Sequence, residues 1–299
     1  MRTEFPDVVD STMRAAFVAC EHKFFYEYIY QIAPQGSNRD LIAGAAFAAG
    51  ICEVRRSYFE KGYDRDLCLA KGMEAIIQNW ECEDTFDDYV KSQKRIIWAL
   101  DYYFEQYPLE TDIVTPLDLG GGKFAIESSF ALPIPGTEHP KTGDPIMYAG
   151  RYDMLGVREG VLYIVDEKTT KQLGPSWSNN WTLRSQFTGY VWAAQEFGHP
   201  VAGAIIRGIS FLKERNDTQQ VITYRPKWQL DRWLEQLSLD VNRMIECWKA
   251  NEWGYDLDAA CSHYGGCPFM KLCDNQNPEA LIDLYYGERK WDPLRRGDD

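Results

Sequence analysis

Long apolar runs are missing from this 299-residue sequence. No segment reaches about 18 consecutive apolar residues, the length that a membrane-spanning helix needs. The first residues, MRTEFPDVVDST, contain no apolar core of the kind that marks a secretory signal peptide. The sequence therefore predicts neither a membrane span nor export, and we expect a cytoplasmic protein.

Positive charge and histidine are also scarce. Lys and Arg number 32 against 45 Asp and Glu, the net charge is −13, and there are four histidines. Broad, sequence-blind wrapping of nucleic acid needs many Lys and Arg, so this balance disfavours it. The charge still allows a local basic channel and suits a site that binds cations. We interpret the histidines as surface or loop residues: His22, His139, His199 and His263.

Apolar residues are plentiful: they make up 45% of the chain, with ten Trp, eighteen Tyr and fourteen Phe. A chain of this length and composition can bury a substantial core in one large domain or two modest ones. The helical spacing of apolar residues predicts helices before residue 108. They cover 11–31, 39–61, 65–80 and 85–107.

From about residue 120 the pattern changes to strands, at 121–136, 146–157, 161–169, 201–212 and 219–225. Helices are expected at 179–197 and 227–250. The sequence predicts an α/β fold, in which a mixed sheet flanked by helices follows an N-terminal helical region and precedes a Cys-rich C-terminal tail. We expect one compact domain overall, divided at 1–38, 39–115, 116–225 and 226–299.

Two of the strands are joined by Glu159-Gly160, which suits a two-residue hairpin loop because Gly tolerates the second position. This loop pairs Val157 with Leu162 and places Asp153 opposite Asp166. Side chains alternate along a strand, so Lys168 lies on the face of Asp166 and Glu167 points the other way, toward solvent or a structural partner.

Facing carboxylates repel each other, and a divalent cation between them removes that cost. Oxygen ligands suit Mg²⁺ or Mn²⁺, and such an ion activates water and neutralises phosphate charge. Lys168 is placed to stabilise the developing negative charge. Asp153, Asp166 and Lys168 thus favour phosphodiester hydrolysis. The alternative is a solvated strand end, with Asp153 in a turn.

Three segments carry a family resemblance: GRYDMLG at 150–156, IVDEKTT at 164–170 and QFTGY at 186–190. They resemble the Gly-x-x-Asp, Asp-x-Lys-Thr and Gln-x-x-x-Tyr motifs of the PD-(D/E)XK nuclease superfamily, in its RecB-like exonuclease branch. The resemblance implies a restriction-endonuclease-like core acting on DNA.

Residue by residue, the resemblance implies metal-binding roles for Asp153 and Asp166 and a catalytic role for Lys168. It implies that Gln186 and Tyr190, which share a helix face, organise the site and its DNA. The strand AIESSFALPI resembles the acidic strand that often precedes Gly-x-x-Asp, so Glu127 is a further candidate metal ligand. Many relatives carry Gly-x-x-x-His on an earlier helix, whereas GAAFA has Gly44 and then Ala48 in the place of the His.

The tail segment CSHYGGCPFMKLC separates its three cysteines by five residues each time. Such a tail lacks a hydrophobic core of its own, so it needs a cross-link to hold it folded. A cubane cluster or tetrahedral zinc takes four ligands, and Cys20 is a candidate for the fourth; chance spacing of buried cysteines is the alternative. The other cysteines fall in predicted helices as small apolar residues: Cys52, Cys68, Cys82 and Cys247.

The cysteine pattern extends the family resemblance. Several RecB-like nucleases, including the CRISPR-associated exonucleases, carry one Cys before the nuclease core and three after it. The resemblance implies a 4Fe-4S cluster held by Cys20, Cys261, Cys267 and Cys273. The gap between Cys261 and Cys267 is longer than the common Cys-x-x-Cys.

Together, these features predict a metal-dependent DNA exonuclease that cuts single strands or duplex ends in recombination, repair or spacer processing, in a phage or bacterium. One alternative is a catalytically weak DNA-end-binding subunit of a recombination or CRISPR adaptation complex. Another is a zinc-stapled structural protein. Surface or packing roles compete with DNA binding for the basic and aromatic residues near the motifs: Arg14, Lys23, Arg151, Lys171, Arg184, Arg207, Trp177 and Trp181.

Overall fold

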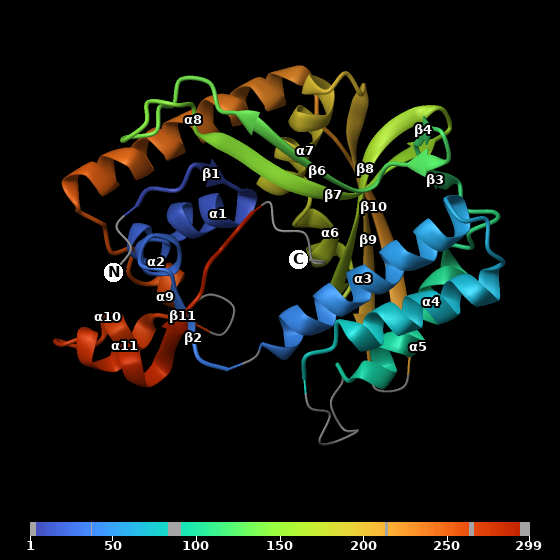
Figure 1. Cartoon of the computed structure of the whole chain (residues 1–299), viewed down its shortest axis with the longest axis horizontal. Coiled ribbons are helices and arrows are strands. Elements are labelled where there is room, and N and C mark those ends of the chain that lie inside the picture. Colours follow the sequence, from blue (N-terminus) through green and yellow to red (C-terminus); the bar gives the residue numbers. More distant parts are fainter. Residues whose placement is uncertain (1–3, 37, 83–90, 213–214, 263–265, 294–299) are drawn as a thin grey trace. The chain divides into compact units, whose positions relative to one another are not determined.

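The computed structural model describes residues 4–36, 38–82, 91–212, 215–262 and 266–293 (Figure 1). They form two compact units. The sheet unit contains Ser37–Ser128 and Arg151–Leu230, and the thiol unit contains Met1–Gly36, Ser129–Gly150 and Asp231–Asp299. No described helix is both long and apolar enough to cross a membrane.

Three helices begin the sheet unit: α3 (Arg39–Phe59), α4 (Arg65–Gln78) and α5 (Gln93–Gln106). Asn38 and Asp64 cap the first two by accepting backbone N–H groups. Gly72 allows α3 and α4 to approach closely, because a Cβ atom there would lie 2.4 Å from the Val54 side chain. The apolar faces of these helices form one core with residues of the sheet. The helices predicted at 39–61 and 65–80 are confirmed.

The sheet follows from residue 114 onward. In the sheet unit the strands run in the order β7 (Met147–Arg158), β8 (Val161–Thr170), β9 (Val201–Phe211) and β10 (Asn216–Tyr224). Short strands precede them: β3 (Val114–Pro116), which pairs with β7, β4 (Asp118–Gly120), β5 (Lys123–Phe124) and β6 (Ile126–Pro133), which also pairs with β7.

The strands β8 and β9 are parallel, whereas β7 is antiparallel to β8 and β10 is antiparallel to β9. Parallel strands need a crossover, which here contains α6 (Pro175–Asn179) and α7 (Ser185–Glu196). The predicted mixed sheet flanked by helices is therefore confirmed.

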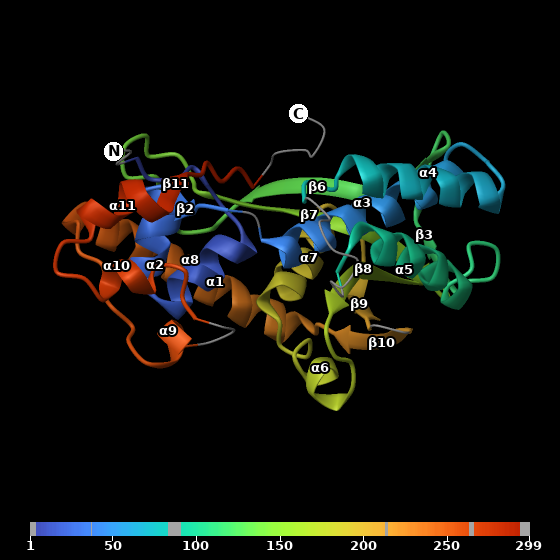
Figure 2. The ribbon, with the colours of Figure 1, turned by 90° about the horizontal axis from the view of Figure 1, so that it is seen from below.

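Opposite faces of β8 contact different helices (Figure 1 and Figure 2). Glu167 points to the face where Arg55 of α3 and Tyr103 of α5 bind it. Lys168 points to the other face, where its Nζ lies 5.8 Å from the Phe187 ring of α7. The predicted division of the charged triplet between two faces is confirmed, and Glu167 is buried rather than solvated.

The hairpin between β7 and β8 has the predicted two-residue loop. Both loop residues have positive φ, 51° at Glu159 and 78° at Gly160, as a type I′ turn requires. Met154 pairs with Val165, and Val157 with Leu162, which is the predicted register.

Glu159→Asn is expected to stabilise the protein by about 0.5–1 kcal/mol, because Asn tolerates the left-handed conformation better than Glu does. Urea unfolding measures the change in the free energy of unfolding. An unchanged or lower stability would contradict the role of this turn.

The thiol unit combines both ends of the chain. It contains β1 (Val8–Val9), α1 (Ser11–Ala19), α2 (Glu21–Phe24), η1 (Phe25–Ile29), which is a π-helical turn, and β2 (Ile32–Pro34). Its later elements are most of α8 (Lys227–Ala250), α9 (Ala259–Ser262), α10 (Met270–Cys273), α11 (Glu279–Tyr285) and β11 (Tyr286–Glu288). The strands β2 and β11 pair, so the tail is anchored to residues 32–34.

The tail also has an apolar core, contrary to the prediction. Phe269, Leu272 and Tyr286 are buried with Tyr26 and Ile32. The sequence pattern missed this core because its members come from segments more than 200 residues apart.

Several predicted helix bounds are wrong. The helix predicted at 11–31 is interrupted at Cys20, whose backbone is extended (φ −167°, ψ 120°), because the amide of His22 donates to Gly254 O instead of continuing the helix. The helix predicted at 179–197 begins at Ser185, after a turn rich in polar residues. The helix predicted at 85–107 is described only from residue 93, and residues 85–90 lie outside the described part.

Candidate active site and thiol pocket

Asp166 and Lys168 form the centre of the candidate active site. Asp166 is 1% exposed, and the Lys168 Nζ atom lies 2.6 Å from its Oδ1. The two groups form a buried ion pair, and no other described group bonds to Oδ1. An oxygen of this kind, buried beside a partly exposed cation, remains available to a further ligand.

Asp153 reaches the same region from β7. The ladder ends at the pair of Met154 and Val165, and Asp153 and Asp166 follow directly after it, close enough for their charges to act on each other. The backbone N–H of Glu167 donates to Asp153 Oδ2 at 3.2 Å. The hairpin thus brings two carboxyls and one ammonium group together, as the sequence predicted.

Burial dominates the electrostatics of these groups. It raises the pKa of Asp166 to about 8, with the charge of Asp153 adding to the effect and that of Lys168 opposing it. Burial also raises the pKa of Asp153. Burial alone would lower the pKa of Lys168, but the charges of Asp166 and Asp153 raise it, so this side chain stays protonated. Burial thus favours the neutral form of both carboxyls in the metal-free site, and a bound cation would compete with protons for them.

Glu127, the third predicted ligand, lies on β6 in a left-handed conformation with φ of 53°. Strain of this kind in a non-Gly residue is concentrated at functional sites. Its Oε2 forms an ion pair with Arg151 Nε at 2.6 Å. Burial, together with the charge of Asp153, raises the pKa of Glu127 to about 7.

Gln186 and Tyr190 project from α7 on the face of Asp166. Gln186 Nε2 donates to the Tyr190 hydroxyl at 3.2 Å, and the Tyr190 ring packs edge-on against Tyr152. Burial raises the pKa of Tyr190 to about 12, the Gln186 hydrogen bond opposes this, and the charge of Asp166 adds to it. The structure therefore brings the predicted Gln-Tyr pair to the carboxyls.

Two residues that the sequence analysis did not single out, Arg55 and Tyr103, bind Glu167 behind the site. An arginine within the largely apolar helix α3 was a signal, since a buried charge requires a partner. The partner is 112 residues away, beyond any local pattern.

Two of the DNA-contact candidates are buried. Arg207 is 1% exposed and pairs through two nitrogens with Asp112, and Trp177 is 7% exposed. Both therefore have packing roles, the alternative that the sequence left open.

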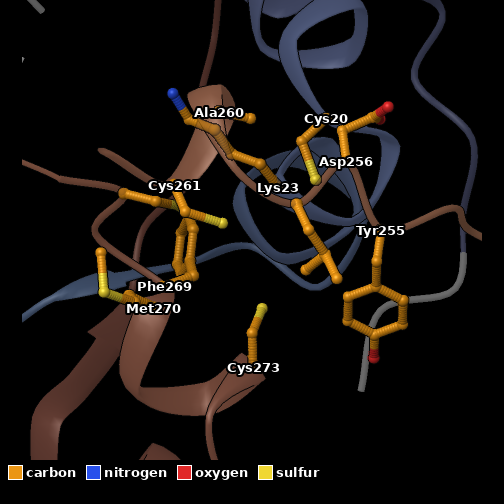
Figure 3. Close-up of a pocket in the computed structure, with 11 residues that line it drawn as sticks. Cys20, Lys23, Tyr255, Asp256, Ala260, Cys261, Phe269, Met270 and Cys273 are labelled. Carbon is orange, nitrogen blue, oxygen red and sulfur yellow. The ribbon is translucent and has the colours of Figure 1, made fainter. Parts of the chain in front are cut away.

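The four predicted ligand cysteines line one pocket of the thiol unit, here the thiol pocket: Cys20, Cys261, Cys267 and Cys273. Figure 3 shows the thiols of Cys20, Cys261 and Cys273 pointing toward a common space. The extended backbone of Cys20 and the bond from Cys267 N to Cys261 O, at 2.7 Å, fix two of these segments. The rest of the lining includes Phe269, Met270 and Leu257.

Burial raises the pKa of Cys273 to about 11, and the neighbouring thiols add to the effect. Burial raises the pKa of Cys267 as well. Mutually destabilising thiolates in an apolar pocket suit a metal centre, which binds thiolates and releases their protons.

Within the described ranges, no group of three or more His, Cys, Asp or Glu side chains is arranged to hold a single metal ion. This applies to Asp153, Asp166 and Glu127 and to the thiol pocket alike. The predicted ligand sets therefore stay predictions.

The remaining cysteines and histidines differ in part from expectation. Cys52, Cys68 and Cys247 lie in helices, but Cys82 does not, because α4 ends at Gln78. His139 lies in a loop, as predicted, but is buried there and bonds to Phe5 O. His22 lies in α2, half-buried and stacked on Tyr255. His199 lies in a loop, as predicted, and His263 lies outside the described residues.

The raised carboxyl pKa values predict a pH-dependent stability. The pKa of Asp166 rises from 3.8 to about 8 on folding and that of Glu127 from 4.5 to about 7. Between the unfolded and the folded pKa values, the metal-free folded state binds more protons than the unfolded state. The free energy of unfolding therefore falls as the pH rises through this range. We expect the Tm in EDTA to fall between about pH 5 and pH 8. Asp166→Asn should flatten this dependence, and equal slopes in both proteins would contradict the assignment.

Comparison with known proteins adds to this geometry. The model of a family described as the PD-(D/E)XK nuclease superfamily matches residues 13–274. A solved structure of a candidate exonuclease from Eubacterium rectale is 16% identical, with a TM-score of 0.48, and the match covers 86% of this chain and 88% of that one. A second solved structure, that of SSO0001, is 12% identical, with a TM-score of 0.32, and the match covers 80% of this chain and 98% of that one. No curated protein sequence matches the chain.

Proposed function

Because the chain belongs to the PD-(D/E)XK nuclease superfamily, we propose that it is a metal-dependent DNA exonuclease of the RecB-like branch. The observation that carries the proposal is the convergence of Asp153, Asp166 and Lys168 at one end of the β7–β8 hairpin. This is the arrangement that phosphodiester hydrolysis needs, with oxygen ligands beside a fixed positive charge.

The donor set fits a hard divalent cation such as Mg²⁺ or Mn²⁺. Asp153 and Asp166 would hold it, since both are buried carboxyls whose charges act on each other and on Lys168, with Glu127 as a further ligand. When bound, the ion would activate water and neutralise phosphate charge. Lys168 keeps its proton and stabilises the negative charge that develops on the phosphate. Gln186 fixes the Tyr190 hydroxyl, and the pair orients the site and its DNA.

The thiol pocket fits a 4Fe-4S cluster. All four predicted ligand cysteines line this pocket, which supplies the thiolate donors that such a cluster takes. The preference for a cluster over a single zinc ion rests on the resemblance to RecB-like nucleases, with one Cys before the nuclease core and three after it. The role of the cluster would be to stabilise the fold.

Cleavage of end-labelled DNA tests the proposal. Purified protein is incubated with Mg²⁺ or Mn²⁺ and single-stranded or duplex DNA labelled at the 5′ or 3′ end. We expect stepwise shortening from one end, abolished by EDTA and by Lys168→Ala. Absence of cleavage, or cleavage that survives Lys168→Ala, would refute it.

Ala48 supports a second candidate, a catalytically weak DNA-end-binding subunit of a recombination or CRISPR adaptation complex. Gly44 faces β8, where its Cβ would lie 3.6 Å from Thr169 Oγ1, and Arg55 binds Glu167. Ala48 lies one turn after Gly44 on α3 and offers no ligand where many relatives have His. DNA-end binding without cleavage would favour this candidate.

The proposal also includes the biological pathway, the partner proteins and the division of the chain into segments. They are a place in recombination, repair or spacer processing, partner proteins in such a complex, and the four-segment division at residues 38, 115 and 225. An exonuclease of this class would act on DNA ends produced by a helicase or another nuclease.

A further inference from the structure

Glu167, the middle residue of the charged triplet, is held by two residues on the face of β8 away from Lys168. Arg55 Nη1 donates to Glu167 Oε2 at 3.1 Å, and Nη2 donates to Oε1 at 2.5 Å. The Tyr103 hydroxyl donates to Oε1 at 2.8 Å and accepts from Arg55 Nη2 at 3.2 Å. All three side chains are at most 9% exposed. A two-pronged charge pair of this kind fixes position and orientation together.

The backbone of Glu167 is connected directly to the residues of the candidate active site. Its N–H donates to Asp153 Oδ2 at 3.2 Å, and its two chain neighbours are Asp166 and Lys168. Any rotation or shift of residue 167 therefore moves three site residues at once. The Arg55 side chain, anchored on α3, opposes that motion.

We propose that Arg55 is a positioning residue for the metal site, which acts by holding Glu167 and through it Asp153, Asp166 and Lys168. This inference rests on the proposed function and adds a residue that none of the three nuclease motifs contains. On this proposal, one face of β8 carries the reactive groups of the motifs, and the other face carries the residues that hold them in position.

The chain contains a second largely buried pair for comparison. Arg14 Nε donates to Asp240 Oδ2 at 2.7 Å, and the two side chains are 13% and 12% exposed. This pair belongs to the thiol unit, whereas Arg55 and Glu167 belong to the sheet unit. Arg207 is not independent of the Arg55–Glu167 pair, because it is paired with Glu167 across the ladder and interacts with Tyr103. A role limited to stability predicts similar effects for the two pairs.

The experiment replaces each pair by apolar residues of similar size, because removing one partner alone leaves a buried charge. The test variant is Arg55→Met with Glu167→Leu, and the control variant is Arg14→Met with Asp240→Leu. The full-length protein is measured for thermal unfolding, for Mn²⁺ affinity by calorimetry without DNA, and for single-turnover cleavage at varied DNA concentration. Arg55→Lys, which keeps the charge but loses the two-pronged contact, is measured in the same way.

We expect the test variant to bind Mn²⁺ about 10- to 100-fold more weakly and to cleave more slowly by a similar factor, at an unchanged half-saturating DNA concentration. Arg55→Lys should lie between it and wild type, and the control should stay within about threefold of wild type. A folded test variant with wild-type Mn²⁺ affinity, or equal losses in test and control, would overturn the inference. If the test variant does not unfold cooperatively, wild-type Mn²⁺ affinity in Arg55→Lys overturns it instead.

Failure of the proposed function gives a different pattern. If wild type binds Mn²⁺ but does not cleave DNA, the exonuclease proposal fails, and the Mn²⁺ affinities of the variants still decide whether Arg55 positions the site. If wild type binds no Mn²⁺, both are refuted.

Discussion

Asp166→Asn is expected to reduce metal-dependent DNA cleavage by about 100- to 1000-fold. The side chain is 1% exposed, so an amide of the same shape preserves packing while removing the charge that a cation and Lys168 require. Single-turnover cleavage of end-labelled single-stranded DNA in Mg²⁺ and in Mn²⁺ measures the loss. Calorimetry should show weaker Mn²⁺ binding by the same variant.

A strand aspartate outside the site provides the control. Asp217 lies on β10 with its side chain 42% exposed and pairs with Arg215. Asp217→Asn should leave the cleavage rate within about twofold of wild type, since exposed pairs contribute little. Cleavage by Asp166→Asn at the wild-type rate would remove this carboxyl from the catalytic site and with it the chemical basis of the proposal.

Cys267→Ala is expected to lower the Tm by about 10 °C or more and to remove the iron, because the binding energy of a structural metal centre is part of the folding free energy. Cys267 lines the thiol pocket, and its neighbour Phe269 packs in the core of the tail. Iron and acid-labile sulfide content, visible absorbance and a thermal unfolding scan measure the effect on anaerobically purified protein.

Cys68→Ala is the matched control, because Cys68 is buried in α4 and does not line the thiol pocket. It should retain full iron content and lose about 1 kcal/mol of stability through the small cavity it leaves. Zinc without iron in the wild-type protein would replace the cluster assignment by a zinc staple. A Cys267→Ala protein with wild-type iron and Tm would exclude Cys267 as a ligand.

The regular part of the fold was predictable from sequence periodicity. The helix 227–250 and the strand 201–212 agree with α8 and β9 to within one residue, because their apolar spacing continues to their ends. Cys20 shows where periodicity fails. The helical pattern continues through it, but contacts of Glu21 and His22 with Gly254 impose an extended residue. Interactions across that distance leave no local trace in the sequence.

The active site was predictable for a related reason. A two-residue loop fixes the register of its hairpin, so the pairing from Arg158 with Val161 to Met154 with Val165 followed from Glu159-Gly160, and Asp153 and Asp166 come directly after its last pair. Arg55 and Tyr103 were not predictable, since their contacts with Glu167 depend on how α3 and α5 pack on the sheet. The register of the hairpin determines where the reactive groups lie, whereas tertiary packing determines which residues support them.

The composition of the thiol pocket has a consequence for protein synthesis. Cys20 leaves the ribosome early, and Cys267 follows roughly 250 residues later, about 10 to 50 s at typical translation rates. During that interval the pocket lacks most of its thiols, and Tyr26 and Ile32 lack their partners Phe269 and Tyr286. Insertion of the proposed cluster would therefore be a step for the finished chain, and a nascent chain that stalls before the tail would present an open apolar surface to chaperones and proteases.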